Sequence, residues 1–237
     1  MDALILCGGL GTRLRKILKH TPKVLAKIMG KEFLTYQIEF LKKNKIRKIY
    51  LATGYLHSEI YDKYKHEDNI LFSKEKIPLG TGGAILNYIK KVGPTNGNLL
   101  VINGDSFINL DIKKFIHFHK LKKSDVSICC TLIHEDNKRY GTINIDKNYK
   151  ITNFSEKNKK NKKNKIINAG IYLFKVSFLK KYLPYNNSKI SLEEEILPKI
   201  SKNNLVYGYI CKKKFIDIGT PESFKKSQLN FKKIYSN

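Results

Sequence analysis

Residues 4–14 read LILCGGLGTRL, and a Pro-Lys pair follows at 22–23. An apolar run of strand length therefore ends in three glycines, a threonine and an arginine. Such a turn lets backbone N–H groups approach a polyphosphate closely, with a cation beside them. A dinucleotide-binding fingerprint starting at Gly9 would need glycine at position 14, which is leucine, and a P-loop sequence does not occur. The stretch predicts a phosphate-binding turn of another kind.

Composition favours one large α/β domain over residues 1–237. The chain is 41% hydrophobic, which is enough to bury a sizeable core. No apolar stretch approaches the ~18 residues of a spanning helix. The amino terminus runs into a strand without a basic leader. We therefore expect a cytoplasmic protein that does not associate with a membrane.

The strong positive charge is distributed along the whole chain. Lys and Arg total 46 against 20 Asp and Glu, a formal net charge of +26. The densest run, Lys157 to Lys165, has no interleaved aromatic residue and is expected to be a solvated loop. Because no nucleic-acid-binding motif is present, we expect no nucleic-acid partner, while the basic field would attract small anions.

The four cysteines are Cys7, Cys129, Cys130 and Cys211, and none has C-x-x-C spacing. Cys129 and Cys130 are expected on opposite faces of a strand. We interpret all four as small buried apolar residues rather than as disulfide or metal ligands.

Segments of strand and helix character alternate through the first half of the chain. Strands are predicted over 3–7, 46–53, 70–72, 98–103 and 126–132, and helices over 33–45, 58–64, 80–92 and 111–121, the last capped by Asp111. This alternation predicts a mainly parallel sheet with helices on both faces. Ligands then belong at the carboxyl ends of the strands, where the first glycine turn and Gly104-Asp105 both fall.

The second half is predicted to begin with a hairpin over 141–146 and 150–154, followed by strands at 166–174, 206–211 and 215–218 and a helix at 222–234. Another helix starts at Ser191, with Glu194 completing a capping box. Glu193, Glu194 and Glu195 are expected to form a solvated first turn. His117 and His119 lie two apart in a predicted helix, where side chains diverge, so we expect no metal site there.

Six short blocks occur in a fixed order: GGLGTRL at 8–14, PK at 22–23, PLGTGGA at 78–84, NGD at 103–105, NAGIY at 168–172 and DIGTP at 217–221. In this order and spacing the chain resembles the sugar-1-phosphate nucleotidylyltransferases. The resemblance implies an α/β nucleotide-diphospho-sugar transferase (Rossmann-like) fold, with a mixed, mainly parallel sheet flanked by helices. It also implies a nucleotide-binding half over about 1–125 and a sugar-binding half over about 126–237.

The implied reaction is attack by a sugar 1-phosphate oxygen on the α-phosphorus of a nucleoside triphosphate, with release of pyrophosphate. Because the nucleophile is already an anion, catalysis consists of aligning the substrates and neutralising their charge. The resemblance assigns catalysis to Arg13, Lys23, Asp105 and Asp217. It assigns Mg²⁺, the expected cofactor, to the two aspartates.

The resemblance also supplies two sets of binding residues. Nucleotide binding is assigned to Leu6, Gly8, Gly9, Gly11, Thr12, Arg13, Glu75, Gly80, Thr81 and Asp105. Sugar phosphate binding is assigned to Lys23, Tyr140, Gly141, Glu156, Lys157, Asn168 and Gly170. This chain has Asn158 where the family usually has a proline after the Glu-Lys pair.

Base selection is attributed to Glu75, which stands five residues before Gly80. A carboxylate accepts hydrogen bonds and can receive those of guanine N1–H and N2–H₂, whereas adenine lacks an N1–H. This favours GTP. Within the family the chain looks most like the D-glycero-α-D-manno-heptose 1-phosphate guanylyltransferases, which make GDP-heptose for surface polysaccharides.

Several alternatives remain at this stage. They are a mannose-1-phosphate guanylyltransferase, a uridylyl- or thymidylyltransferase, a nucleotide-binding regulatory protein without catalysis, and a nucleic-acid-binding protein. A homodimer is the default expectation for oligomeric state, because twofold dimers are the commonest assemblies.

Overall fold

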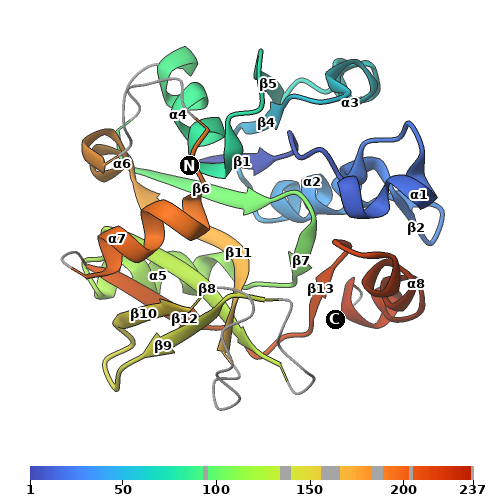
Figure 1. Cartoon of the computed structure of the whole chain (residues 1–237). Helices are drawn as coiled ribbons and strands as arrows, with labels where there is room; N and C mark the ends of the chain where they lie inside the picture. Colours follow the sequence, from blue (N-terminus) through green and yellow to red (C-terminus); the bar gives the residue numbers. More distant parts are fainter. Residues whose placement is uncertain (93–95, 134–139, 156–165, 183–188, 203–204, 236–237) are drawn as a thin grey trace.

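The computed structural model describes residues 1–92, 96–133, 140–155, 166–182, 189–202 and 205–235. Its centre is a nine-stranded sheet in the order β10-β9-β11-β6-β1-β4-β5, with β8 beside β11 and β12 beside β8 (Figure 1). The strands are β1 (Asp2–Leu6), β4 (Ile49–Thr53), β5 (Ile70–Lys74), β6 (Asn98–Asn103), β8 (Val126–Leu132), β9 (Thr142–Ile145), β10 (Ile151–Ser155), β11 (Ile166–Lys175) and β12 (Val206–Ile210).

The sheet contains both parallel and antiparallel pairs of strands. The strands β6, β1, β4 and β5 are parallel, and β12 is parallel to β8. Strand β11 runs antiparallel to β6, β8 and β9. The predicted α/β fold, with a mixed sheet flanked by helices, is confirmed.

Helices cover both faces of the sheet and enclose two apolar cores. One core holds residues of α2 (Phe33–Lys43), α3 (His57–Tyr64), α5 (Ile112–Leu121) and α8 (Pro221–Tyr235). The other holds residues of α4 (Gly80–Val92), α6 (Val176–Tyr182) and α7 (Leu197–Ser201). Because side chains alternate along a strand, Ile5 lies in the first core and Leu4 in the second. Cys129 and Cys130 are divided in the same way, as predicted, and all four cysteines are free and buried.

An aromatic cluster anchors the carboxyl-terminal helix α8. The ring of Phe231 lies 4.3 Å from that of Tyr36 and 5.6 Å from that of Phe107, measured between centroids. Phe231 is almost fully buried, which contributes about 2 kcal/mol or more to the packing of α8. This packing fixes the segment that immediately precedes α8, where Asp217 lies.

Most predicted elements are found, and β6 and β8 have the predicted bounds. The predicted strand 46–53 begins only at Ile49, and the cap of Asp111 is confirmed, since its side chain accepts the Lys114 N–H at 3.0 Å. Several short elements were not predicted. They are η1 (Thr12–Leu14), α1 (Arg15–Leu18), η2 (Lys23–Leu25), β2 (Lys27–Ile28), β3 (Lys31–Glu32), β7 (Ser106–Ile108) and α6, and β7 forms a separate two-stranded sheet with β13 (Phe215–Asp217).

The predicted helix start at Ser191 is present, but its capping differs from the prediction. Ser191 Oγ accepts the Glu194 N–H at 3.1 Å, while the side chain that returns to the Ser191 N–H is that of Glu195, at 2.8 Å. The first turn is a π-helix, η3 (Leu192–Ile196), in which the Ile196 N–H donates to Ser191 O. Because a π-helical turn is wider than an α-helical turn, the glutamate that accepts the Ser191 N–H is Glu195, one residue after the predicted Glu194.

His119 faces inward from α5, with its Nδ1 2.8 Å from Ser127 Oγ, and burial lowers its pKa to about 4. Within the described ranges, none of the helices combines the length and apolar character needed to cross a membrane.

Candidate functional site

Two adjoining hollows lie at the carboxyl ends of β1 and β6. We call them the first hollow, of about 410 Å³, and the second hollow, of about 570 Å³. They share the wall residues Arg13, Thr81, Asn103, Asp105 and Gly219. A ligand group at this shared wall can be reached from either side, so the site suits two substrates that meet.

The first hollow gathers the predicted nucleotide-binding residues from three separate segments of the chain, together with Lys23 of the predicted sugar-side set. Its lining includes Leu6, Gly8, Gly9, Gly11, Thr12, Arg13, Lys23, Glu75, Gly80, Thr81 and Asp105. Gly8 allows the close approach of Glu75, since a Cβ at position 8 would lie 2.9 Å from Glu75 Oε1. The glycine-rich turn therefore gives Glu75 access to the hollow.

Glu75 is a buried carboxylate at the edge of the first hollow, with 7% of its surface exposed. Its Oε2 accepts the Leu79 N–H at 3.0 Å, which leaves Oε1 on the side of Gly8. Burial raises the pKa of Glu75, and the Leu79 N–H opposes the rise only in part. A buried acceptor of this kind is chemically suited to select a ligand by its hydrogen-bond donors.

Lys23 and Asp105 form an ion pair at the shared wall. Lys23 Nζ lies 2.5 Å from Asp105 Oδ2, and the lysine side chain is only 11% exposed. Asp105 follows Gly104, where a Cβ would lie 2.6 Å from Leu6 O and 2.8 Å from Val24 Cγ1. The glycine thus permits β1 and β6 to approach at their ends, which brings Asp105 within reach of Lys23.

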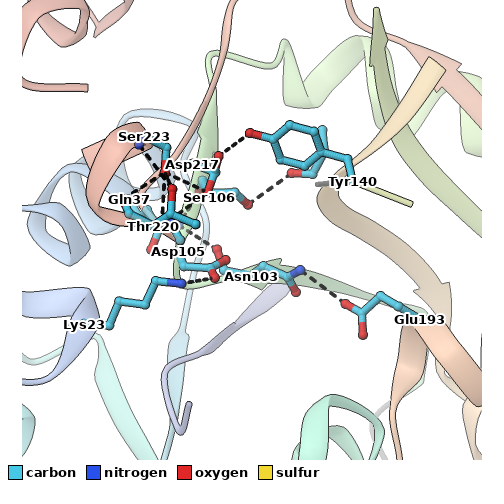
Figure 2. Close-up of polar contacts among 12 residues, drawn as sticks. Lys23, Gln37, Asn103, Asp105, Ser106, Tyr140, Glu193, Asp217, Thr220 and Ser223 are labelled. Atoms are coloured by element: carbon cyan, nitrogen blue, oxygen red, sulfur yellow. Dashed lines mark hydrogen bonds and ion pairs between the residues drawn. The ribbon is translucent and has the colours of Figure 1, made fainter. Parts of the chain in front are cut away.

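Asp217 reaches the same wall from the far end of the sequence. Strand β13 pairs antiparallel with β7, so that Asp217 lies opposite Ser106, and the Ile218 N–H donates to Asp105 O at 2.9 Å. Asp217 Oδ1 accepts the Gly219 N–H at 2.7 Å and the Ser223 hydroxyl at 3.3 Å. Its Oδ2 accepts the hydroxyl of Tyr140 (Figure 2).

Asp105 and Asp217 are the carboxylates of this site that could hold Mg²⁺, and both line the second hollow. A Cβ built on Gly219 would lie 2.6 Å from Asp217 Oδ1, 3.6 Å from Lys23 Nζ and 3.7 Å from Arg13 Nη2, so carboxylate and cationic groups face one small space. Among the described residues no cluster of three or more His, Cys, Asp or Glu side chains is found. Two carboxylates, with phosphate oxygens and water completing the shell, are a usual Mg²⁺ environment.

Lys23 of the predicted sugar-side set lines the first hollow, and four other members lie in the second hollow. Tyr140, Gly141, Asn168 and Gly170 line it. Asn168 Nδ2 donates to the Tyr172 hydroxyl at 2.7 Å, and its Oδ1 accepts the Gly170 N–H at 2.9 Å. The other two predictions, Glu156 and Lys157, lie outside the described residues, as does the basic run that begins at Lys157.

The prediction of a solvated turn at 193–195 was wrong for Glu193. Its carboxylate accepts hydrogen bonds from Thr81 Oγ1 at 2.6 Å, Asn103 Nδ2 at 3.2 Å and the Tyr172 hydroxyl at 3.0 Å. Glu193 also lines the second hollow. The available signal was its position beside the apolar residues Leu192 and Ile196, both buried, which places it at the edge of the packed face.

Gln37 was also missed as a functional-site residue. Its Nε2 donates to Asn103 O at 2.9 Å and to Ser106 O at 2.7 Å, so it braces the turn that carries Asp105. Gln37 is buried among apolar neighbours on α2. A polar residue within the apolar stripe of a helix was the signal that sequence reasoning could have used.

The fold and this site define an α/β protein with a glycine-rich turn and two carboxylates beside two adjoining hollows. The chain belongs to the nucleotidyl transferase family, whose sequence profile matches residues 2–233. It is therefore an enzyme of the nucleotidyltransferase class.

Two relatives resemble the chain over nearly their full length. It is 40% identical over 228 residues to the D-glycero-alpha-D-manno-heptose 1-phosphate guanylyltransferase of Campylobacter jejuni, covering 94% of this chain and 97% of the relative. It is 37% identical over 232 residues to the enzyme of the same name from Aneurinibacillus thermoaerophilus, covering 96% and 97%.

A solved structure is also similar to this chain over nearly the full length of both. HddC from Yersinia pseudotuberculosis, complexed with GMP-PN, superposes with a TM-score of 0.82 at 34% identity and covers 97% of this chain and 99% of that one.

Proposed function

We propose that this enzyme transfers GMP from GTP to D-glycero-α-D-manno-heptose 1-phosphate, giving GDP-heptose and pyrophosphate. The observation that carries the proposal is the convergence of Arg13, Lys23, Asp105 and Asp217 at the wall between the two hollows. The likeness to the heptose 1-phosphate guanylyltransferases supports the choice of substrates. A product of this kind would serve surface polysaccharide synthesis.

The nucleotide belongs in the first hollow and the sugar phosphate in the second, as halves 1–125 and 126–237 of the chain suggest. The triphosphate would follow the glycine-rich turn, where backbone N–H groups receive phosphate oxygens. Glu75 Oε1 would accept the Watson–Crick donors of guanine. The sugar ring would then lie over Asn168 and Gly170, with Tyr140-Gly141 at its side.

The reaction needs no general base, because the attacking phosphate oxygen is an anion. It forms a bond to the α-phosphorus of GTP while the bond from that phosphorus to the bridging oxygen of pyrophosphate breaks. Lys23 would hold the two reacting phosphates together, and Arg13 would neutralise the departing pyrophosphate. Mg²⁺ held by Asp105 and Asp217 would supply further charge neutralisation when bound.

Lys23 has a second task in this scheme. In the structure its ammonium group is paired with Asp105, so both groups are partly neutralised before substrate arrives. Entering phosphate offers Lys23 another acceptor, and a metal ion offers Asp105 another cation. Substrate and metal binding are therefore expected to favour one another.

The test is pyrophosphate release with Mg²⁺, using GTP, UTP, dTTP, CTP and ATP against heptose, mannose and glucose 1-phosphates. Release with GTP and the heptose phosphate well above every other pair is expected. Release with mannose 1-phosphate as the preferred acceptor would retain the guanylyl transfer and replace the sugar. Nucleotide binding without release from any pair would instead favour a regulatory protein without catalysis.

A further inference from the structure

The carboxylate of Glu193 lines the second hollow and is hydrogen-bonded to Thr81 and Asn103, which line both hollows. It accepts three side-chain hydrogen bonds from three different elements, namely α4 through Thr81, β6 through Asn103 and β11 through Tyr172. Figure 2 shows Asn103 and Glu193 facing one another away from the Asp105 cluster. A side chain that joins three elements at the wall of a two-substrate site can control how the substrates are held relative to each other.

The hydrogen bonds around Glu193 form a continuous path from one hollow to the other. Thr81 lines both hollows and accepts the Leu192 N–H at 2.8 Å, which directs its own hydroxyl proton to Glu193 Oε2. At the other end, Tyr172 accepts from Asn168 Nδ2 and donates to Glu193 Oε1. Asn168 in turn lines the second hollow.

The directions of these bonds require an acceptor at the centre. Thr81 and Tyr172 each already accept one hydrogen bond, so each has its proton left to donate. A carboxylate can receive both protons and the Asn103 amide as well, whereas an amide of the same size would present a donor to one of these partners. Glutamine at position 193 would therefore leave one of these donors without its acceptor.

We propose that Glu193 is a positioning residue that sets the nucleotide in the first hollow against the sugar phosphate in the second. This inference rests on the proposed function, because it assigns the two substrates to the two hollows. In-line transfer requires the attacking oxygen within about 3–3.5 Å of phosphorus, and a misplacement of about 1 Å can cost about 10²-fold in rate. Glu193 touches neither the α-phosphorus nor the leaving group in this scheme and acts through Thr81 and Asn168.

The decisive variant is Glu193→Gln, which keeps the size and removes an acceptor. We expect kcat to fall by about 10²-fold, while the Kd of a non-hydrolysable GTP analogue, measured without sugar phosphate, stays close to the wild-type value. Glu195→Gln is the matched control, because it makes the same charge change two residues along, and glutamine also serves in a capping box. This control is expected to retain wild-type kcat.

A double-mutant cycle separates positioning from general destabilisation. Tyr172→Phe removes the hydroxyl that donates to Glu193 and should lower kcat as Glu193→Gln does. Because both changes break the same path, adding Glu193→Gln to Tyr172→Phe should cost much less than it costs alone. Should Glu193→Gln fail to fold, a lowered kcat in Tyr172→Phe, with the Kd of the GTP analogue unchanged, decides the question.

Three outcomes would overturn the inference. One is an unchanged kcat in Glu193→Gln, and another is a change confined to the KM for the sugar phosphate, which would make Glu193 a simple binding group. The third is strict additivity in the cycle. If the wild-type enzyme transferred no GMP at all, the proposed function would be refuted instead. Failure of the proposed function and failure of the Glu193 inference are therefore distinguishable.

Discussion

The replacement Glu75→Gln tests how this enzyme selects its base. Glu75 Oε2 accepts the Leu79 N–H at 3.0 Å inside the protein, so the amide oxygen of glutamine is expected to keep that bond. The new NH₂ group then takes the place of Oε1, on the side of Gly8, and an acceptor for guanine becomes a donor. The variant therefore changes recognition at one atom while the local fold persists.

The magnitude follows from the hydrogen bond that is lost. A hydrogen bond to a charged group contributes about 1.5–3 kcal/mol, and each 1.36 kcal/mol corresponds to a factor of ten in rate or binding constant. We therefore expect kcat/KM for GTP to fall by about 10- to 150-fold. The value for ATP, which lacks the N1–H donor, should change little, so the preference for GTP over ATP shrinks by the same factor.

The direction in which Glu75→Gln changes the free energy of unfolding follows from the pKa of Glu75. Burial raises the pKa of Glu75 in the folded state, so the native protein holds its proton to higher pH than the unfolded chain does. The contribution of Glu75 to the free energy of unfolding is thus present below the unfolded pKa and is lost as pH rises through the folded pKa. Glutamine has no such loss, so the variant should melt at or above the wild-type temperature at neutral pH.

The assay is steady-state pyrophosphate release with GTP and ATP over a range of pH, with Glu59→Gln, on the exposed face of α3, as the control. In the wild type, the KM for GTP should rise as the pH falls, because protonation of Glu75 removes the acceptor. Since burial raises the pKa of Glu75, this rise should begin at a higher pH than it would for an ordinary carboxyl group. This rise should be absent in Glu75→Gln. An unchanged ratio of GTP to ATP activity in a folded variant would refute the assignment of Glu75.

Three further predictions concern other parts of the site. Arg13→Ala should lower the rates of synthesis and of pyrophosphorolysis by about 10²- to 10³-fold, measured with radiolabelled pyrophosphate; the exposed Arg47→Ala is its control, and normal pyrophosphorolysis would reject the leaving-group role. Asp217→Asn should lower kcat and raise the Mg²⁺ concentration needed for half-maximal rate, whereas Asp111→Asn, which keeps a helix cap, should not; an unchanged Mg²⁺ titration would remove Asp217 from the metal site. Gly104→Ala should lower stability by about 1–3 kcal/mol, because its Cβ would meet Leu6 O, whereas Gly9→Ala meets nothing within 4 Å; equal melting temperatures in calorimetry would contradict the packing argument.

The sequence allowed the sheet and the first hollow to be predicted because their signals are local. Apolar runs of strand length predicted β1, β6 and β8, and two glycine-containing blocks were predicted at the carboxyl ends of β1 and β6. Periodicity gave no warning of the short strand β7, which is defined by its pairing with β13 far along the chain. Contacts of that kind depend on tertiary packing and leave little local signal.

Glu193 shows the same limit at the level of a single side chain. Three adjacent glutamates in a first helical turn are ordinarily solvated, and Glu194 and Glu195 are indeed exposed. Glu193 differs because α4, β6 and β11 converge on it, and only the assembled fold brings Thr81, Asn103 and Tyr172 together there. The acceptor role of Glu193 follows from these partners rather than from its neighbours in sequence.

The central claim is that the α-phosphate of GTP passes to a heptose 1-phosphate while the other two phosphates leave together. The most direct measurement incubates the enzyme, Mg²⁺ and D-glycero-α-D-manno-heptose 1-phosphate with GTP labelled at either the α- or the γ-phosphate, followed by separation of the products. We expect the α-label in GDP-heptose and the γ-label in pyrophosphate. Gamma-label in inorganic phosphate or on the sugar, with no α-labelled sugar nucleotide formed, would contradict the claim.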